Sequence, residues 1–170
     1  MLKDFCPSCS VGMMGWPILL ICFLLKQAES PQGVADTMYV SVGIQLVYIA
    51  KFFWWETGYF DSIDIMHDRF GFYICWGCLN WLPSLYTNCT FFLVTNHIDV
   101  GVTKASLLFL AGIAAVYINY AIDEQRQRFR QTRGNTLIWG KKPECIEASY
   151  KTTSGEKRSI ILFIYLFFFF

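Results

Sequence analysis

The chain has 170 residues, of which 55% are hydrophobic and 16% are charged, and its formal net charge is +1. A soluble domain usually has about 25% charged residues, so this composition argues against an ordinary soluble domain. The apolar residues also gather in blocks instead of spreading along the chain, which is typical of a membrane protein.

Four apolar blocks follow one another, at residues 12–25, 38–55, 71–96 and 105–122. A membrane helix needs roughly 20 mostly apolar residues to cross the hydrocarbon of a bilayer. The third block has this length and no charge, the fourth nearly reaches it, and the first two reach it with their interfacial flanks. We therefore predict an all-α, polytopic membrane protein with about four membrane helices.

The start of the chain does not resemble a secretory signal. The sequence MLKDFCPSC is too polar, and the first apolar block contains a proline and no small-residue cleavage site. We therefore expect the first block to be a membrane helix of the protein itself.

The basic residues predict an orientation in the membrane. Nine of the 14 lysines and arginines fall between Arg126 and Arg158. Since basic loops face the cytoplasm, this segment is expected in the cytosol. With alternating crossings, the connection at residues 56–70 is then cytosolic, and those at 26–37 and 96–104 are lumenal.

The connection between the second and third blocks is acidic. It contains Glu56, Asp61, Asp64 and Asp68, and the last three have the spacing of one helical face. A solvated loop is the commoner reason for such charges. His67 and Asp68, however, lie just before an uncharged block, and an ionisable pair at a membrane boundary is a candidate proton donor or partner of a substrate hydroxyl. Both interpretations stay open on these residues alone.

A basic cluster directly follows the fourth block. If the helix continues, Arg126 and Arg130 are four residues apart and share one face. Two guanidinium groups on one face can donate paired hydrogen bonds to a phosphate. The commoner role of a basic cluster beside a membrane helix is to bind anionic lipid headgroups, so this alternative also stays open.

Two of the cysteine pairs have zinc-ligand spacing. Cys6 and Cys9 form CPSC, and Cys75 and Cys78 form CWGC. The second pair lies in an uncharged, aromatic-rich block, where thiolates would be costly to desolvate. We therefore favour buried small side chains over zinc ligands and expect no metal site.

Two long runs carry a resemblance to a known family. The run ETGYFDSIDIMHDRFGFYICWGCLNWLPSLYT, with FFWW before it, resembles the Δ7-reductases of the sterol reductase family, and so does RFRQTRGNTLIWGKKPECIEASY. The pieces WLPxLYT and LIWGxKPxxIExSY separate these enzymes from the Δ14-reductases and the lamin B receptor. The resemblance begins near Asp4, includes GMMGW at 12–16, and extends to about Gly155.

This resemblance implies a fold and an activity. The family consists of multi-pass proteins of the endoplasmic reticulum membrane, so the chain would supply about four of roughly ten helices. It implies NADPH-dependent reduction of the Δ7 double bond of 7-dehydrocholesterol or a related sterol, in cholesterol biosynthesis. The nicotinamide would deliver hydride to one carbon, and the other carbon would be protonated. Sterol and membrane lipid are the implied partners, association with other sterol-biosynthesis enzymes is a further expectation, and no nucleic acid is expected.

The resemblance also implies site residues. Arg126 and Arg130 match the family's basic cofactor positions, with Arg126 in a place that is usually lysine, which keeps the charge but changes the geometry. His67 and Asp68 match positions in the loop before the helix that helps to wall the sterol pocket. They are the candidates for a proton relay.

The resemblance stops after Gly155, where EKRSIILFIYLFFFF replaces the segments that carry most of the family's cofactor contacts. We therefore divide the chain into a partial sterol reductase membrane domain, 1–155, and a divergent apolar tail, 156–170. Because a misplacement of about 1 Å can cost about a hundredfold in rate, we expect this chain to be inactive by itself.

A non-catalytic membrane isoform, which binds sterol or associates with a full-length reductase, remains the alternative function. A small transporter or channel has less support, because it would favour internal repeats or charges paired within the membrane. The blocks at 71–96 and 105–122 contain no charge.

Overall fold

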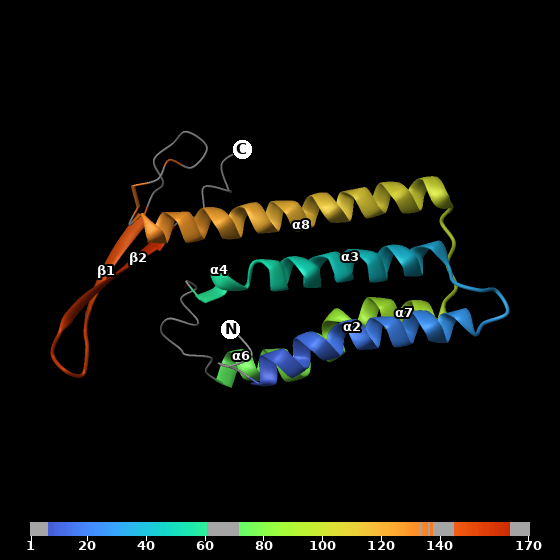
Figure 1. The fold of residues 1–170 in the computed structure, drawn as a ribbon, viewed down its shortest axis with the longest axis horizontal. Coiled ribbons are helices and arrows are strands. Elements are labelled where there is room, and N and C mark those ends of the chain that lie inside the picture. The colour runs from blue at the N-terminus through green and yellow to red at the C-terminus, as the bar shows by residue number, and fades with distance from the viewer. Residues whose placement is uncertain (1–6, 61–71, 133, 136, 138–144, 164–170) are drawn as a thin grey trace. The chain divides into compact units, whose positions relative to one another are not determined.

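The computed structural model describes residues 7–60, 72–132, 134, 135, 137 and 145–163. These residues are mostly helical, as predicted, and end in one pair of strands (Figure 1). The elements in chain order are α2 (Pro7–Ala28), α3 (Asp36–Trp54), α4 (Glu56–Phe60), α6 (Phe72–Trp76), η1 (Gly77–Tyr86), α7 (Asn88–Thr95), α8 (Val102–Gln131), β1 (Cys145–Lys151) and β2 (Lys157–Phe163). The chain divides into two compact units: the first unit is Met1–Asn119 and the second unit is Tyr120–Phe170.

Three of the described helices are long and apolar enough to cross a membrane. They cover Val11–Ala28, Asp36–Trp54 and Val102–Gln131. These ranges confirm the first, second and fourth predicted blocks. Each helix is also longer than its apolar block, because polar residues continue the helix beyond the hydrocarbon-length stretch.

The third predicted block differs from the single helix that we expected. It forms three successive helices, α6, the π-helix η1 and α7, and none of them alone has the length of a span. Pro83 lies inside η1 and has no N–H to donate. Thr87 donates its hydroxyl to the carbonyl of Pro83 at 2.6 Å, at the junction with α7. The wider turns and this junction interrupt the regular α-helix.

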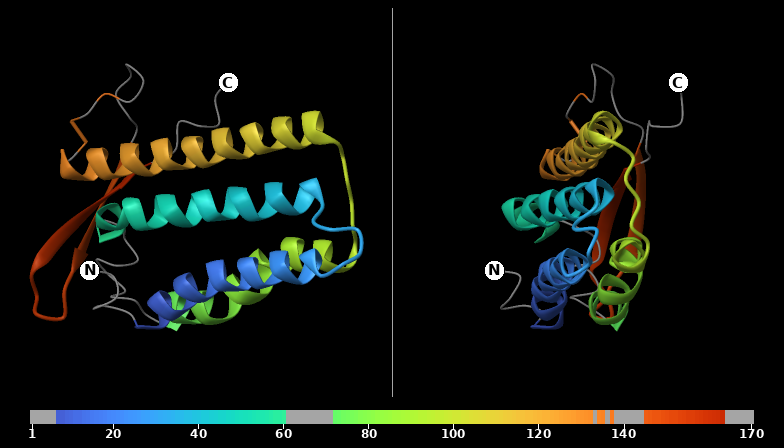
Figure 2. Two further views of the ribbon diagram at one scale, coloured as in Figure 1. Left: turned by 45° about the vertical axis from the view of Figure 1, so that its right-hand side comes forward. Right: turned by 90° about the vertical axis from the view of Figure 1, so that its right-hand side faces the viewer.

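The core of the first unit lies between α2 and α3, with side chains of η1 and α7 packed against it. Met13, Trp16 and Leu20 project from α2 at helical spacing, and Met38 and Val42 project from α3. Figure 2 shows α2 and α7 side by side in both views, with α3 next to them. The opposite side of α2 is apolar but exposed, which suits a helix that faces acyl chains.

A polar network lies inside this apolar core. Gln45 of α3 donates its side-chain N–H to Thr90 of α7 at 2.7 Å, and Thr90 is completely buried. Ser41 lies one turn before Gln45, and its hydroxyl is 2.9 Å from that of Thr90. Trp16 of α2 donates to Gln45 from the other side. The network therefore joins three helices that are far apart in the sequence.

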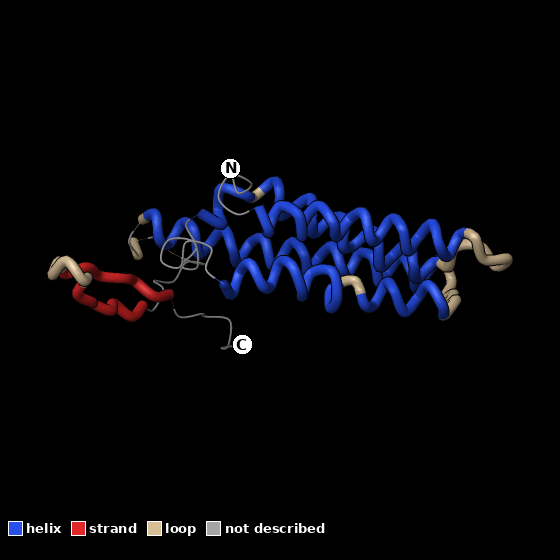
Figure 3. Tube along the Cα trace, turned by 90° about the horizontal axis from the view of Figure 1, so that it is seen from below, coloured by secondary structure: helices blue, strands red, loops and turns tan. Residues whose placement is uncertain are grey.

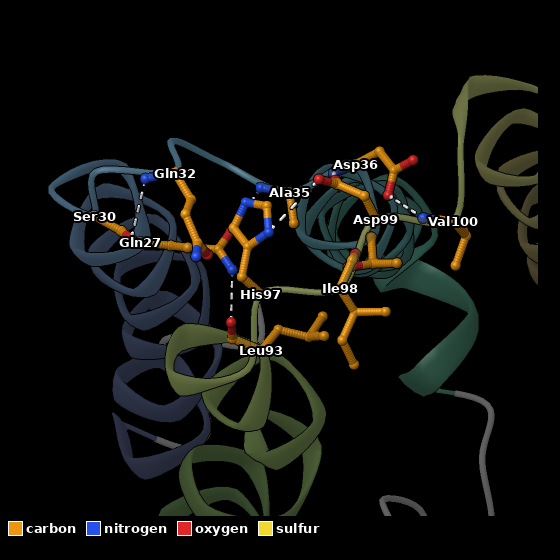
Figure 4. Close-up of polar contacts among 11 residues, drawn as sticks. Gln27, Ser30, Gln32, Ala35, Asp36, Leu93, His97, Ile98, Asp99 and Val100 are labelled. Atoms are coloured by element: carbon orange, nitrogen blue, oxygen red, sulfur yellow. Dashed lines mark hydrogen bonds and ion pairs between the residues drawn. The ribbon is translucent and has the colours of Figure 1, made fainter.

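The connections before α3 and before α8 meet at one end of the first unit (Figure 4). Asp36 N–H donates to Asp99 Oδ1 at 3.0 Å, and Val100 N–H donates to Asp36 Oδ1 at 3.1 Å. Gln27 of α2 donates to the carbonyl of Leu93 at 2.6 Å and accepts from the N–H of Ala35. The geometry agrees with the prediction that both connections face the same side of the membrane. That this side is the lumen stays a prediction.

The strands form an antiparallel hairpin in the second unit (Figure 3). Cys145 pairs with Phe163 at one end and Lys151 with Lys157 at the other. Gly155 has φ of 86°, a conformation that glycine adopts without strain, and its N–H donates to the carbonyl of Thr152. This hairpin was not predicted, and it places residues 157–163 of the predicted tail in a strand.

Candidate functional site

The C-terminal part of α8 projects beyond its apolar stretch. Residues 105–122 contain no charge and span about 27 Å as a helix, close to the thickness of bilayer hydrocarbon. The helix continues to Gln131 and becomes polar from Asp123 onward. Its last turns therefore belong at or beyond the membrane boundary, where charged side chains are hydrated.

Arg126 and Arg130 share one face of this polar segment. The sequence placed them on one face only if the helix continued through both residues. It does, because α8 ends at Gln131. Residues four apart differ by about 40° around a helix axis, so the two side chains leave neighbouring positions on its surface. Both are half-buried. The structure thus confirms the shared helical face, and the phosphate-binding role stays a prediction.

Asp123 belongs to the same site and was missed in the sequence analysis. Its Oδ1 accepts a hydrogen bond from Arg126 Nη2 at 2.8 Å, and its side chain is only 13% exposed. The carboxylate holds one edge of the Arg126 guanidinium and so restricts its orientation. The signal was available in the sequence, because acidic and basic residues three apart on a helix are neighbours.

Arg128 provides an internal comparison on the same helix. It pairs with Glu124 at 2.5 Å, and its side chain is 65% exposed, against 36% for Arg126. Two residues along a helix correspond to about 200° of rotation. Arg128 therefore lies on a different face, in a solvated i,i+4 ion pair of the ordinary stabilising kind.

The end of α8 is closed by the chain that follows it. Phe129 is completely buried, and Gly134, with φ of 81°, donates its N–H to the carbonyl of Phe129 at 3.0 Å. A side chain on Gly134 would touch the Phe129 ring. These contacts fix the last turn, which carries Arg130, so both arginines stand on an ordered helix end.

This arrangement is able to bind an anion. Guanidinium groups form bidentate, charge-assisted hydrogen bonds with phosphate, and the neighbouring apolar stretch limits access of water from the membrane side. Asp123 orients one of the two guanidiniums and leaves the pair with a net positive charge. The residues present therefore fit a phosphate-bearing cofactor or lipid.

His67 and Asp68, the predicted proton-relay candidates, lie outside the described residues. Their role stays a prediction. The described residue range before them ends with α4, which begins at Glu56.

A lysine inside the second membrane helix was also missed by the sequence analysis. Lys51 donates to Asn119 Oδ1 at 2.9 Å and to Tyr59 Oη at 3.3 Å. Its Nζ also lies 5.7, 5.4 and 5.6 Å from the ring centroids of Tyr48, Trp55 and Tyr59. Aromatic faces and an amide oxygen attract a cation where water is scarce, so Lys51 joins α3 and α4 to α8.

Among the described residues, no group of three or more histidine, cysteine or acidic side chains is arranged to hold a metal ion. Cys6 lies outside the described part of the chain. The expectation of no metal site at the two CxxC pairs therefore stays a prediction.

Three apolar helices of membrane-spanning length define a helical, multi-pass membrane protein. Comparison with known proteins then gives the family. Residues 1–162 match the Ergosterol biosynthesis ERG4/ERG24 family. The chain belongs to this family of sterol reductases, as the resemblance of its motifs indicated.

The relatives include several sterol reductases. The chain is 49% identical to the 7-dehydrocholesterol reductase of Arabidopsis thaliana over 155 residues, which cover 91% of this chain and 36% of that protein. It is 38% identical to the 7-dehydrocholesterol reductase of Xenopus laevis, over 86% of this chain and 31% of that protein. The Delta(14)-sterol reductase of Methylotuvimicrobium alcaliphilum is 32% identical over 91% of this chain and 36% of its own length. The chain thus spans about a third of the length of these relatives.

Proposed function

We propose that this chain forms part of an NADPH-dependent sterol reductase that acts on the Δ7 double bond of 7-dehydrocholesterol or a related sterol in the endoplasmic reticulum membrane. The substrate follows from the relatives, since those at 38–49% identity are named 7-dehydrocholesterol reductase. The Δ14-reductase relatives are 29–32% identical. The Δ7 specificity therefore has the stronger support.

The observation that carries the cofactor proposal is the pair of arginines on one face of α8. Arg126 and Arg130 would hold a phosphate of NADPH at the membrane boundary, with Asp123 keeping the Arg126 guanidinium in place through their 2.8 Å contact. When bound, the nicotinamide supplies the hydride that reduces the double bond. His67 and Asp68 are proposed to move the proton that the second carbon requires.

The membrane part of the chain has a matching role. A sterol is almost entirely apolar, so a site between membrane helices can take it directly from the bilayer. The aromatic residues that follow the acidic connection would wall such a site, while the arginines stay hydrated at the end of α8.

A graft tests this function without requiring the chain to act alone. Residues 1–155 would replace the matching segment of the Arabidopsis thaliana relative, expressed in cells that lack their own reductase. We expect the membranes to convert 7-dehydrocholesterol to its Δ7-reduced product with NADPH, at a rate within about tenfold of the unmodified relative. An inserted, intact graft without activity would contradict the proposal.

The chain alone provides the second arm of this experiment. The dependence of rate on accurate cofactor placement predicts no conversion above the empty-vector level. Conversion by the chain alone would show that residues 1–170 contain the complete machinery. Sterol binding without conversion in both arms would instead favour the non-catalytic alternative.

A further inference from the structure

The last turn of α3 carries a lysine inside a helix of membrane-spanning length. A charge at this position is costly unless it has partners, and such residues usually have a functional role. The Lys51 ammonium donates to Asn119 Oδ1 at 2.9 Å. It also lies between 5.4 and 5.7 Å from the ring centroids of Tyr48, Trp55 and Tyr59. The positive charge therefore faces aromatic rings and an amide oxygen of the protein itself.

The contact with Lys51 orients the side chain of Asn119. Because Oδ1 accepts from the ammonium, the Nδ2 group is on the other side of the amide. Among the residues that the structure describes, Asn119 makes no other hydrogen bond, and it is exposed. Amide N–H groups without an acceptor are unfavourable in an apolar environment. This position therefore favours a ligand that supplies an oxygen atom.

The depth of Asn119 decides between two classes of ligand. It belongs to the uncharged stretch 105–122, four residues and about 6 Å before the first charge of the polar segment, Asp123. The phosphate of a phospholipid lies in the headgroup region, outside the hydrocarbon, and would have to move inward by a helical turn. A sterol keeps its hydroxyl group at the edge of the hydrocarbon, because the rest of the molecule is apolar. The depth therefore favours a sterol hydroxyl over a phosphate.

We propose that Asn119 donates a hydrogen bond to the hydroxyl group of the sterol substrate, with Lys51 as the positioning residue. The inference rests on the proposed function, because it names the group that recognises the polar end of the same substrate. A hydrogen bond at this end restricts how far an otherwise apolar molecule can slide between the helices. It thereby limits where the ring double bond lies.

Equilibrium binding to the full chain in phosphatidylcholine nanodiscs tests the proposal. The two ligands are tritiated 7-dehydrocholesterol and its analogue without the hydroxyl group. We expect the wild-type chain to bind 7-dehydrocholesterol about tenfold more tightly than the analogue. Asn119→Leu should weaken binding of 7-dehydrocholesterol about tenfold and change binding of the analogue by less than about twofold. The analogue therefore also shows whether the variant is folded.

Two further variants separate recognition from structure. Lys51→Met should lose part of the preference for the hydroxyl group, because the Asn119 amide is no longer oriented. Ser106→Ala should keep it, since the Ser106 hydroxyl is exposed on the same helix and donates to the carbonyl of Val102.

Equal affinity of the wild-type chain for the two sterols would overturn the proposal, whatever the variants do, and so would binding of neither sterol. A preference that is unchanged in Asn119→Leu would overturn it as well. Sterol reduction by the graft, measured separately, reports on the proposed function. An active graft with no preference for the hydroxyl group would contradict the role of Asn119 alone, and an inactive graft with the predicted preference would contradict the reductase function alone.

Discussion

Trp16 of α2 donates its indole N–H to the side-chain oxygen of Gln45 of α3, with 2.9 Å between Nε1 and Oε1. The Trp16 ring also lies between Tyr48 and Tyr86, with centroid distances of 5.9 and 5.4 Å. The amide nitrogen of Gln45 reaches in the other direction, to Thr90. One side chain thus satisfies polar groups of two neighbouring helices beside the apolar core.

These hydrogen bonds predict a loss of stability when the side-chain amide of Gln45 is removed. Gln45→Leu leaves the Trp16 N–H without its acceptor and removes one of the two hydrogen bonds of the Thr90 hydroxyl. We therefore expect the unfolding free energy in mild detergent to fall by about 1–2 kcal/mol. Val47→Leu, at an exposed position of the same helix, should change it by less than about 0.5 kcal/mol. A loss that is equal in the two variants would contradict the role of the network.

Two glycines of α2 should respond to alanine in opposite directions. A Cβ on Gly12 would collide with the backbone carbonyl of Cys78 in η1, whereas a Cβ on Gly15 would meet nothing within 4 Å. We expect Gly12→Ala to destabilise the protein by about 1–3 kcal/mol. Gly15→Ala should stabilise it by up to about 1 kcal/mol, because glycine loses more backbone entropy on folding. Thermal unfolding of the two variants, side by side, measures the difference. Stabilisation by both would show that α2 and η1 are not in contact.

The contacts of the Lys51 ammonium group should stabilise the packing of α3 against α8. Lys51→Met removes the hydrogen bond to Asn119 and the attraction to three aromatic rings, so we expect a loss of about 1–2 kcal/mol. Lys51→Arg should recover part of this loss, since a guanidinium also binds aromatic faces. Lys104→Met, at an exposed position, serves as the control in thermal unfolding. A Lys51→Met protein as stable as that control would show that the cluster contributes nothing.

The sequence predicted the long helices well because their signal is simple. An uninterrupted apolar stretch such as 105–122 has few alternatives to a membrane helix. The basic pair was predicted for a similar reason, since Arg126 and Arg130 depend only on the continuation of α8. Asp123 was missed because a carboxylate does not itself bind phosphate, and its contact with Arg126 acts only through the guanidinium.

The remaining differences have local causes. The block at 71–96 has the composition of one helix, but Pro83 and the wide turns of η1 break it into three. The hairpin was not predicted, because the apolar residues of 156–170 are also typical of an unstructured apolar tail. The polar run around Gly155, between two segments of seven residues that pair in register, was a turn signal. Long-range contacts such as Gln45 with Thr90 depend on helix packing, which composition does not specify.

The most direct test concerns the cofactor arginines, measured in the graft with the Arabidopsis thaliana relative. The central claim is that Arg126 and Arg130 hold a phosphate of NADPH, whereas Arg128, on another face, does not. The measurement is the KM for NADPH at saturating sterol for Arg126→Gln, Arg130→Gln and Arg128→Gln. Loss of a charge-assisted hydrogen bond predicts an increase of about tenfold to a hundredfold for the first two variants, and the KM of Arg128→Gln should stay within about twofold. Equal KM values for all three variants would contradict the account.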